Sequence, residues 1–139
     1  MEVEPRVLPD SARTAPEAAA AVGTEVGAIV KSLVFVAGGR PVVALVSGSN
    51  RLDERLLGSV AGVPVAKADA EIARSSTGYS IGGVPPFGHA TDVPVFMDRD
   101  LFAYDVVWAA AGRPDSVFEI EPGRLRELSQ ATVVDLKAT

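Results

Sequence analysis

Hydrophobic and polar positions form short blocks along this chain, and their period changes repeatedly between that of a strand and that of a helix. Short apolar runs rich in β-branched residues predict strands. Blocks with apolar residues three and four positions apart, preceded by Thr, Asp or Pro, predict helices. The predicted strands are residues 4–8, 29–36, 41–46, 63–66, 93–97, 104–110, 116–120 and 131–136, and the predicted helices are 15–22, 52–60, 70–74 and 122–128.

The order of these elements indicates the fold class. Residues 29–36 and 41–46 are separated only by Ala37-Gly38-Gly39-Arg40, which predicts a hairpin. Other neighbouring strands are separated by helices, so the pattern fits a doubly wound parallel sheet poorly. We therefore predict an α+β (mixed α/β) fold, in which short helices surround a curved, barrel-like mixed β-sheet.

Composition bounds the organisation and the chemistry. A length of 139 residues, with 47% hydrophobic and 22% charged residues, predicts one domain that spans residues 1–139. The absence of cysteine excludes disulfides, thiolate metal sites and a cysteine nucleophile, and it fits a cytoplasmic protein. A single histidine, His89, excludes sites with two imidazoles. We expect no metal and no cofactor. We also expect no association with membranes, since every apolar run is far shorter than a membrane span.

The formal net charge of −5 limits the partners. Proteins that bind nucleic acid along many phosphates usually carry a basic surface. The charge therefore argues against binding DNA or RNA along its length. It leaves open a short contact near one nucleotide end.

Lys31 stands inside the apolar strand predicted for residues 29–36. Period-two alternation places its side chain on the face of Ile29 and Leu33, opposite to that of Ser32. One interpretation is a lysine that extends its ammonium to solvent from an edge strand. The other is a fixed ammonium that binds a phosphate, a carbonyl oxygen or a developing oxyanion. The strand pattern leaves both open.

The least regular segment, residues 77–89, contains four glycines and the adjacent pair Pro85-Pro86. Glycine allows close approach of the backbone to a ligand, and proline makes the loop stiff. Consecutive N–H groups in such a loop can bind an anion. A long structural turn explains the same composition, so both interpretations stay open.

Three further polar residues are weaker candidates. A lone histidine beside a loop, such as His89, is more often a hydrogen-bonded residue than a catalyst. Asp98 and Asp100 could in principle bind a metal, but they have no obvious partners in the sequence.

Three signatures in order carry a resemblance to a known family: Lys31-Ser32-Leu33-Val34-Phe35, the glycine-proline loop from Gly82 to Gly88, and Gly112. From about residue 14 to residue 136 the chain resembles the YbaK/EbsC and ProX aminoacyl-tRNA deacylases, also called the prolyl-tRNA synthetase-associated editing domain. The resemblance implies a mixed, barrel-like sheet with surrounding helices. It also implies hydrolysis of the ester between a wrongly attached amino acid and the 3′ end of tRNA.

The resemblance assigns roles to particular residues. Lys31 and Gly83 correspond to catalytic positions, with the lysine and backbone amides stabilising the ester oxyanion and water as the nucleophile. The positions that correspond to substrate binding are Ser32, Gly82, Val84, Pro85, Pro86, Phe87, Gly88, His89 and Gly112. The implied partners are the 3′ end of an aminoacyl-tRNA and prolyl-tRNA synthetase.

Details of the resemblance set the expected substrate and the alternatives. The expected substrate is tRNA(Pro) carrying alanine or cysteine. Val117 stands where some members carry an acidic residue, which argues against specificity of the cysteine type. The alternative function is a non-catalytic module that binds the aminoacyl-tRNA 3′ end, a nucleotide or a synthetase. A hydrolase of small esters that uses the same site is a third possibility.

Overall fold

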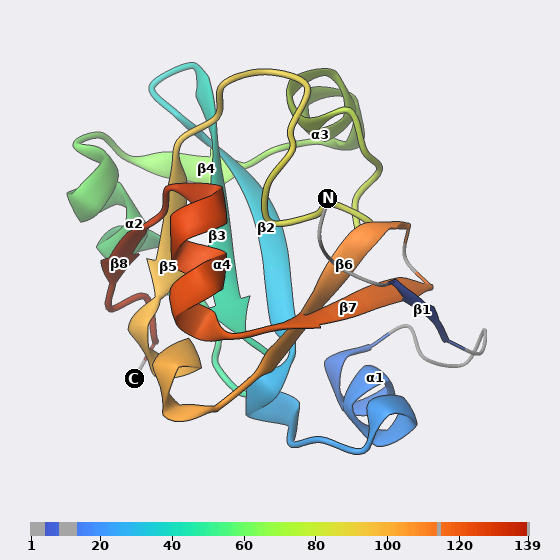
Figure 1. Ribbon diagram of the computed structural model, residues 1–139. Coiled ribbons are helices and arrows are strands. Elements are labelled where there is room, and N and C mark those ends of the chain that lie inside the picture. The colour runs from blue at the N-terminus through green and yellow to red at the C-terminus, as the bar shows by residue number, and fades with distance from the viewer. Residues whose placement is uncertain (1–4, 9–13, 114, 139) are drawn as a thin grey trace.

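The computed structural model describes residues 5–8, 14–113 and 115–138 (Figure 1). Within these ranges the chain forms strands, four α-helices and two short 3-10 helices. No described helix is long and apolar enough to cross a membrane. The strands are β1 (Arg6–Val7), β2 (Val30–Ala37), β3 (Arg40–Ser47), β4 (Val65–Lys67), β5 (Val95–Asp98), β6 (Val107–Arg113), β7 (Ser116–Ile120) and β8 (Thr132–Val134). The helices are α1 (Ala15–Val22), η1 (Val26–Ala28), α2 (Glu54–Ala61), α3 (Ala70–Thr77), η2 (Arg99–Ala103) and α4 (Pro122–Ser129).

The described strands form two sheets. The larger has the order β4-β2-β3-β5-β8, antiparallel from β4 to β3 and parallel from β3 to β8. The smaller, β1-β7-β6, is antiparallel. A parallel bridge between Ile29 and Trp108 joins them. The mixed α+β prediction is confirmed, but the barrel-like closure is not, because the strands stay in two sheets.

The predicted hairpin between β2 and β3 is present, and its turn explains its register. The last pair is Ala37 with Arg40, which leaves Gly38 and Gly39 as a two-residue loop. Their φ angles are 57° and 83°. Positive φ at both positions is what the type I′ hairpin turn requires, and glycine adopts it without a steric penalty.

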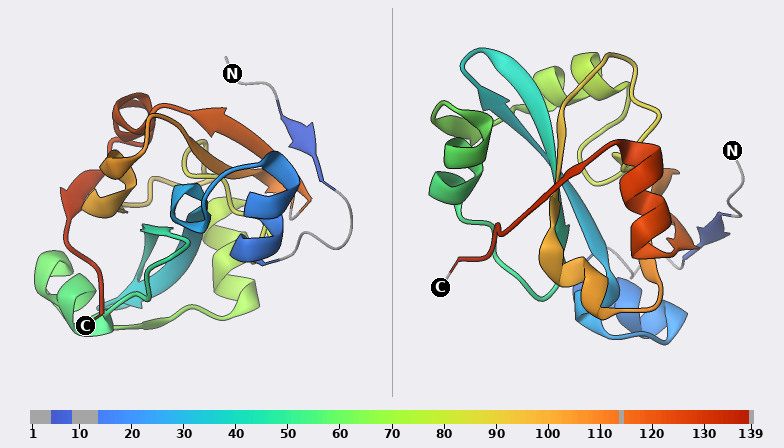
Figure 2. Two further views of the ribbon diagram at one scale, coloured as in Figure 1. Left: turned by 90° about the horizontal axis from the view of Figure 1, so that it is seen from below. Right: turned by 60° about the vertical axis from the view of Figure 1, so that its left-hand side comes forward.

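The two sheets face each other across the main core (Figure 2). Met97 on β5 and Phe118 on β7 are both fully buried there. The outer face of the larger sheet is covered by α2, whose Leu57 packs into a second cluster with Phe35. Helix α1 covers a third cluster, which includes Trp108. Alternation along β2 therefore directs successive side chains to different clusters.

Most predicted boundaries agree with the structure to within a few residues. The predicted strand 4–8 appears as β1, and its residue 4 lies outside the described ranges. Helix α3 extends to Thr77, beyond the predicted end at residue 74, and stops at Gly78 with φ of 86°. Its Asp69 accepts a hydrogen bond from Ile72 N (2.8 Å), so the predicted cap is confirmed.

Candidate functional site

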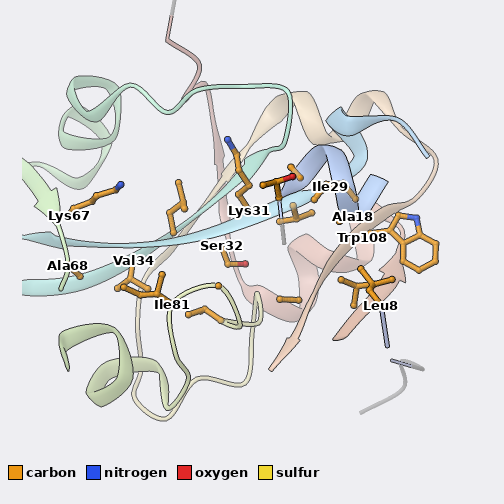
Figure 3. A pocket seen from close by; sticks show the side chains of 18 residues that line it. Leu8, Ala18, Ile29, Lys31, Ser32, Val34, Lys67, Ala68, Ile81 and Trp108 are labelled. Carbon is orange, nitrogen blue, oxygen red and sulfur yellow. The ribbon is translucent and has the colours of Figure 1, made fainter. Parts of the chain in front are cut away.

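A pocket of about 450 Å³ opens beside the middle of β2, where the two sheets separate (Figure 3). This volume lies within the range typical of small-molecule sites. Its walls come from α1, β2, β6, β7, the end of β4 with the residue after it, the residue after β1 and the loop after α3. The wall is mainly apolar and includes Leu8, Ala18, Ile29, Val84, Trp108 and Val117.

The pocket exists because β2 lacks a neighbouring strand along part of one edge. Strand β4 pairs with β2 only from Phe35 to Ala37. At the other end, Ile29 forms its bridge with Trp108 of β6. Between these points no described strand pairs with that edge, so both faces of β2 contribute to the lining.

Ser32 lies at the centre of this unpaired stretch. As the alternation predicted, its side chain points to the opposite side of β2 from that of Lys31, toward the loop that carries Ile81 (Figure 3). The Ser32 hydroxyl oxygen is buried and makes no hydrogen bond to any described residue. A buried polar atom without a partner requires an explanation, and a bound ligand group is one.

Lys31 also lines the pocket, and its ammonium is held in place. Lys31 Nζ donates a hydrogen bond to the main-chain oxygen of Asn50 (2.6 Å). An ammonium has three N–H donors, so two remain for a ligand. Partial burial lowers the pKa of Lys31 below its ordinary 10.5, and the negative charge of Asp98 opposes this shift.

A buried polar cluster fixes the loop that carries Asn50. The Asn50 side chain donates from Nδ2 to Oδ2 of Asp98 and to Oδ2 of Asp100, both at 2.8 Å. Asp98 is fully buried, and its Oδ2 also accepts from Ser47 N (3.1 Å). Its Oδ1 accepts from Asp100 N (3.0 Å). Asp98 therefore connects the ends of β3 and β5 through hydrogen bonds. It also positions Asn50, whose main-chain oxygen accepts from Lys31.

The glycine-proline loop reaches the pocket through Gly82 and Val84. Gly83 N donates to Ser80 O (2.9 Å), which closes a turn. Gly82, the third residue of this turn, has φ of 92°, a conformation that favours glycine. The amide of Gly83 is thus engaged within the loop, whereas those of Gly82 and Val84 donate to no described residue.

The rest of the loop supports this arrangement from outside the pocket lining. Pro85 and Pro86 are buried, and the Phe87 ring meets that of Phe118 edge to face, with centroids 5.8 Å apart. His89 Nε2 donates to Pro85 O (2.7 Å). These contacts fold the loop against the core.

Two further glycines of the predicted site also lie outside the pocket lining. Gly88 is exposed, with φ of 77°. Gly112 has φ of 99°, and a Cβ there would lie 3.0 Å from the Tyr79 ring. The structure thus brings Lys31, Ser32, Gly82 and Val84 together at the pocket. It leaves Gly83, residues 85–89 and Gly112 around it.

Sequence reasoning missed several residues of the site. Asn50 was not singled out, and Asp98 was considered only as a weak candidate metal ligand, because the hydrogen-bond partners of Asp98 lie about fifty residues away in the chain. In the structure both Asp98 and Asp100 accept hydrogen bonds from Asn50. Trp108 gave only a strand signal, and its place in the pocket wall depends on strand order.

Comparisons with known proteins agree with this architecture. Residues 9–128 match the model of a family described as "Aminoacyl-tRNA editing domain". A solved structure described as "a putative trans-editing enzyme for prolyl tRNA synthetase" is 49% identical, with a TM-score of 0.95 over 99% of this chain and 87% of that one.

Two curated proteins are more distant in sequence. The Bacillus subtilis protein named "Uncharacterized protein YwhH" is 32% identical over 88% of this chain and 79% of its own length. The Enterococcus faecalis protein named "Putative Cys-tRNA(Pro)/Cys-tRNA(Cys) deacylase EbsC" is 27% identical over 88% of this chain and 76% of its own length.

Proposed function

Since the chain belongs to the aminoacyl-tRNA editing domain family, we propose that it hydrolyses the ester joining a wrongly attached amino acid to the 3′ end of a tRNA. The observation that carries the proposal is the pocket beside β2, which is apolar except for a few polar groups. An aminoacyl group and its ribose need such a site. The proposed substrate is tRNA(Pro) carrying alanine or cysteine, and the names of two similar proteins support this class.

In the proposed reaction, water attacks the ester carbonyl carbon and a C–O bond forms. The electron pair of the carbonyl moves to oxygen, where the Lys31 ammonium and the amides of Gly82 and Val84 stabilise the negative charge. The bond to the ribose 3′-oxygen then breaks, and that oxygen takes up the proton released by water. The chain contains no cysteine, and His89 Nε2 is hydrogen-bonded to Pro85 O. We therefore assign the role of nucleophile to water.

The tRNA contact is proposed to be short. Lys31 and Lys67 are the lysines among the described residues that line the pocket, and the net charge of the chain is −5. A few cations at the mouth suit the terminal nucleotide rather than a long stretch of phosphates. A prolyl-tRNA synthetase that delivers the tRNA would fit this limited contact, and the 49% identical structure is described as a trans-editing enzyme for that synthetase.

The experiment is release of amino acid from a panel of mischarged tRNAs, including alanyl- and cysteinyl-tRNA(Pro). We expect Lys31→Ala to lower kcat by about 10²–10³-fold, the effect of losing one oxyanion donor. Lys137→Ala, at an exposed position after β8, is the matched control and should keep the rate. Thermal unfolding checks that each variant is folded.

Three outcomes contradict the proposal at different levels. No release from any tRNA by folded protein excludes the hydrolase. Saturable binding of an aminoacyl-adenosine analogue without hydrolysis would instead select the non-catalytic binding module. A Lys31→Ala variant with full activity would leave the hydrolase in place and remove the role assigned to Lys31.

A further inference from the structure

The register of β2 fixes which of its main-chain groups face the pocket. Gly48 N donates to Ile29 O (2.7 Å), so Ile29 directs its main-chain groups toward β3. In an antiparallel pair this direction alternates along the strand. Lys31 and Leu33 therefore bond to β3, and Ser32 directs its N–H and C=O to the opposite edge.

On that opposite edge, the main chain on both sides of Ser32 has hydrogen-bonded partners, whereas the main chain of Ser32 has none. Ala68 N donates to Val34 O (3.1 Å), which continues the pairing with β4. The bridge of Ile29 with Trp108 closes the other end. Across the described ranges, neither main-chain group of Ser32 has a strand or loop partner, and its hydroxyl has none either.

Three polar groups of one residue thus face a mainly apolar pocket. An unpaired strand edge is a template for a further strand, because its N–H and C=O groups bond to a matching backbone. A free α-amino acid ester offers the same two groups as one strand residue: a nitrogen donor and a carbonyl acceptor, separated by one Cα. Such a group can form the paired N–H···O bonds that two directly opposed residues exchange in an antiparallel sheet.

We propose that Ser32 binds the aminoacyl group as a neighbouring strand would, with its N–H donating to the ester carbonyl oxygen and its C=O accepting from the α-ammonium. This inference rests on the proposed function and adds a catalytic donor to it. When water adds to the carbonyl carbon, the negative charge develops on the oxygen that the Ser32 N–H already contacts. It also assigns to Ser32 the contact expected of Gly83, whose amide is engaged with Ser80 O.

The proposal defines the substrate class by its backbone. An α-amino acid ester satisfies both Ser32 groups, whereas the corresponding α-hydroxy acid ester lacks the ammonium donor. Leu8 and Val117 in the pocket wall are apolar and offer the amino acid side chain no hydrogen-bonding group. Recognition would therefore depend on the α-amino group first and on side-chain size second.

The first test removes the main-chain N–H of residue 32. Ser32→Ala is compared with a chain carrying lactic acid at position 32, which differs from it only by an ester oxygen in place of the N–H. We expect kcat for deacylation to fall by about 10²–10³-fold between the two. The thermal midpoint should change little, because this N–H makes no hydrogen bond in the free protein.

The control places 2-hydroxyisovaleric acid at Val36, whose main chain lies in the part of β2 paired with β4. That ester removes a sheet hydrogen bond away from the pocket, so it should lower the thermal midpoint and keep kcat. A lactic acid variant at position 32 with kcat within twofold of Ser32→Ala would overturn the proposal.

A second test does not depend on hydrolysis. We expect 3′-alanylamido-3′-deoxyadenosine, an uncleavable analogue, to shift the Ser32 amide proton downfield in the NMR spectrum and to slow its exchange with solvent. Adenosine alone should do neither. If the protein hydrolyses no tRNA yet shows this shift, the proposed function fails and the Ser32 contact stands. An analogue that binds without moving the Ser32 amide overturns the contact alone, and no binding at millimolar concentration overturns both.

Discussion

Replacing Asp98 by asparagine removes a charge from a fully buried side chain and leaves its volume unchanged. Its two carboxylate oxygens accept three hydrogen bonds, from Ser47 N, Asn50 Nδ2 and Asp100 N. Asparagine offers one accepting oxygen, and its amide group must therefore face at least one donor. Asp98→Asn consequently changes the hydrogen bonding of the buried cluster and removes the negative charge that acts on Lys31.

The expected loss of stability follows from these bonds. One donor left without an acceptor costs about 1–3 kcal/mol, and each remaining bond weakens by about 1 kcal/mol when its acceptor loses its charge. We expect Asp98→Asn to lower the free energy of unfolding by about 3–5 kcal/mol, measured by urea denaturation. This is a large part of the stability of a typical domain, about 5–15 kcal/mol.

Asp69→Asn is the matched control. Asp69 is an exposed helix cap that accepts one hydrogen bond, from Ile72 N, and asparagine caps helices about as well as aspartate. Asp69→Asn should lower the free energy of unfolding by no more than about 0.5 kcal/mol. If Asp98→Asn costs no more than Asp69→Asn, the buried cluster does not stabilise the end of β3 as the distances indicate.

The same variant should change the pKa of Lys31. The negative charge of Asp98 raises the pKa of Lys31 against the lowering caused by burial, so its removal lowers that pKa further. Nitrogen-detected NMR of the lysine ammonium groups measures this directly, and Lys67 and Lys137 are internal references. A pKa of Lys31 that is unchanged or higher in Asp98→Asn would contradict the electrostatic coupling.

Two further predictions concern the pH profile and a glycine. The lowered pKa of Lys31 means that its ammonium loses its proton at a lower pH than a free lysine does. As the pH rises, kcat corrected for spontaneous hydrolysis should therefore start to decrease before pH 10.5 is reached. A kcat that stays constant up to pH 10.5 would contradict a role for the ammonium. Gly27→Ala should lower the free energy of unfolding by about 1–3 kcal/mol, because its Cβ would overlap the Tyr104 hydroxyl. Gly123→Ala, where a Cβ meets nothing within 4 Å, should not destabilise the fold, and equal thermal midpoints for the two variants would refute the overlap.

Local pattern was enough to predict the parts of the fold that depend on neighbouring residues. Gly38 and Gly39 specify a two-residue turn, and alternation in the following and preceding strands then fixes the register. The opposite directions of Lys31 and Ser32 follow from the same alternation. The mixed strand and helix pattern also gave the fold class.

The unpaired edge of β2 could not be predicted in this way. It arises because β4 stops at Lys67 and β6 meets β2 only near Ile29, and both facts depend on how distant strands are ordered. The partners of Asp98 lie 48 and 51 residues away in the sequence, beyond any local period. The hydrogen bond that engages the Gly83 amide depends on turn geometry, which composition does not specify.

Trp108 is the sole tryptophan of the chain, and it lies in the wall of the pocket. Trp108 is 7% exposed, and the guanidinium of Arg6 on β1 lies over its ring, 5.0 Å from the ring centroid. Its fluorescence therefore arises at one known place and responds to what enters the pocket and to the position of β1. Stopped-flow emission with unlabelled ligands would time substrate entry separately from ester cleavage, so the chain carries its own optical reporter of each turnover.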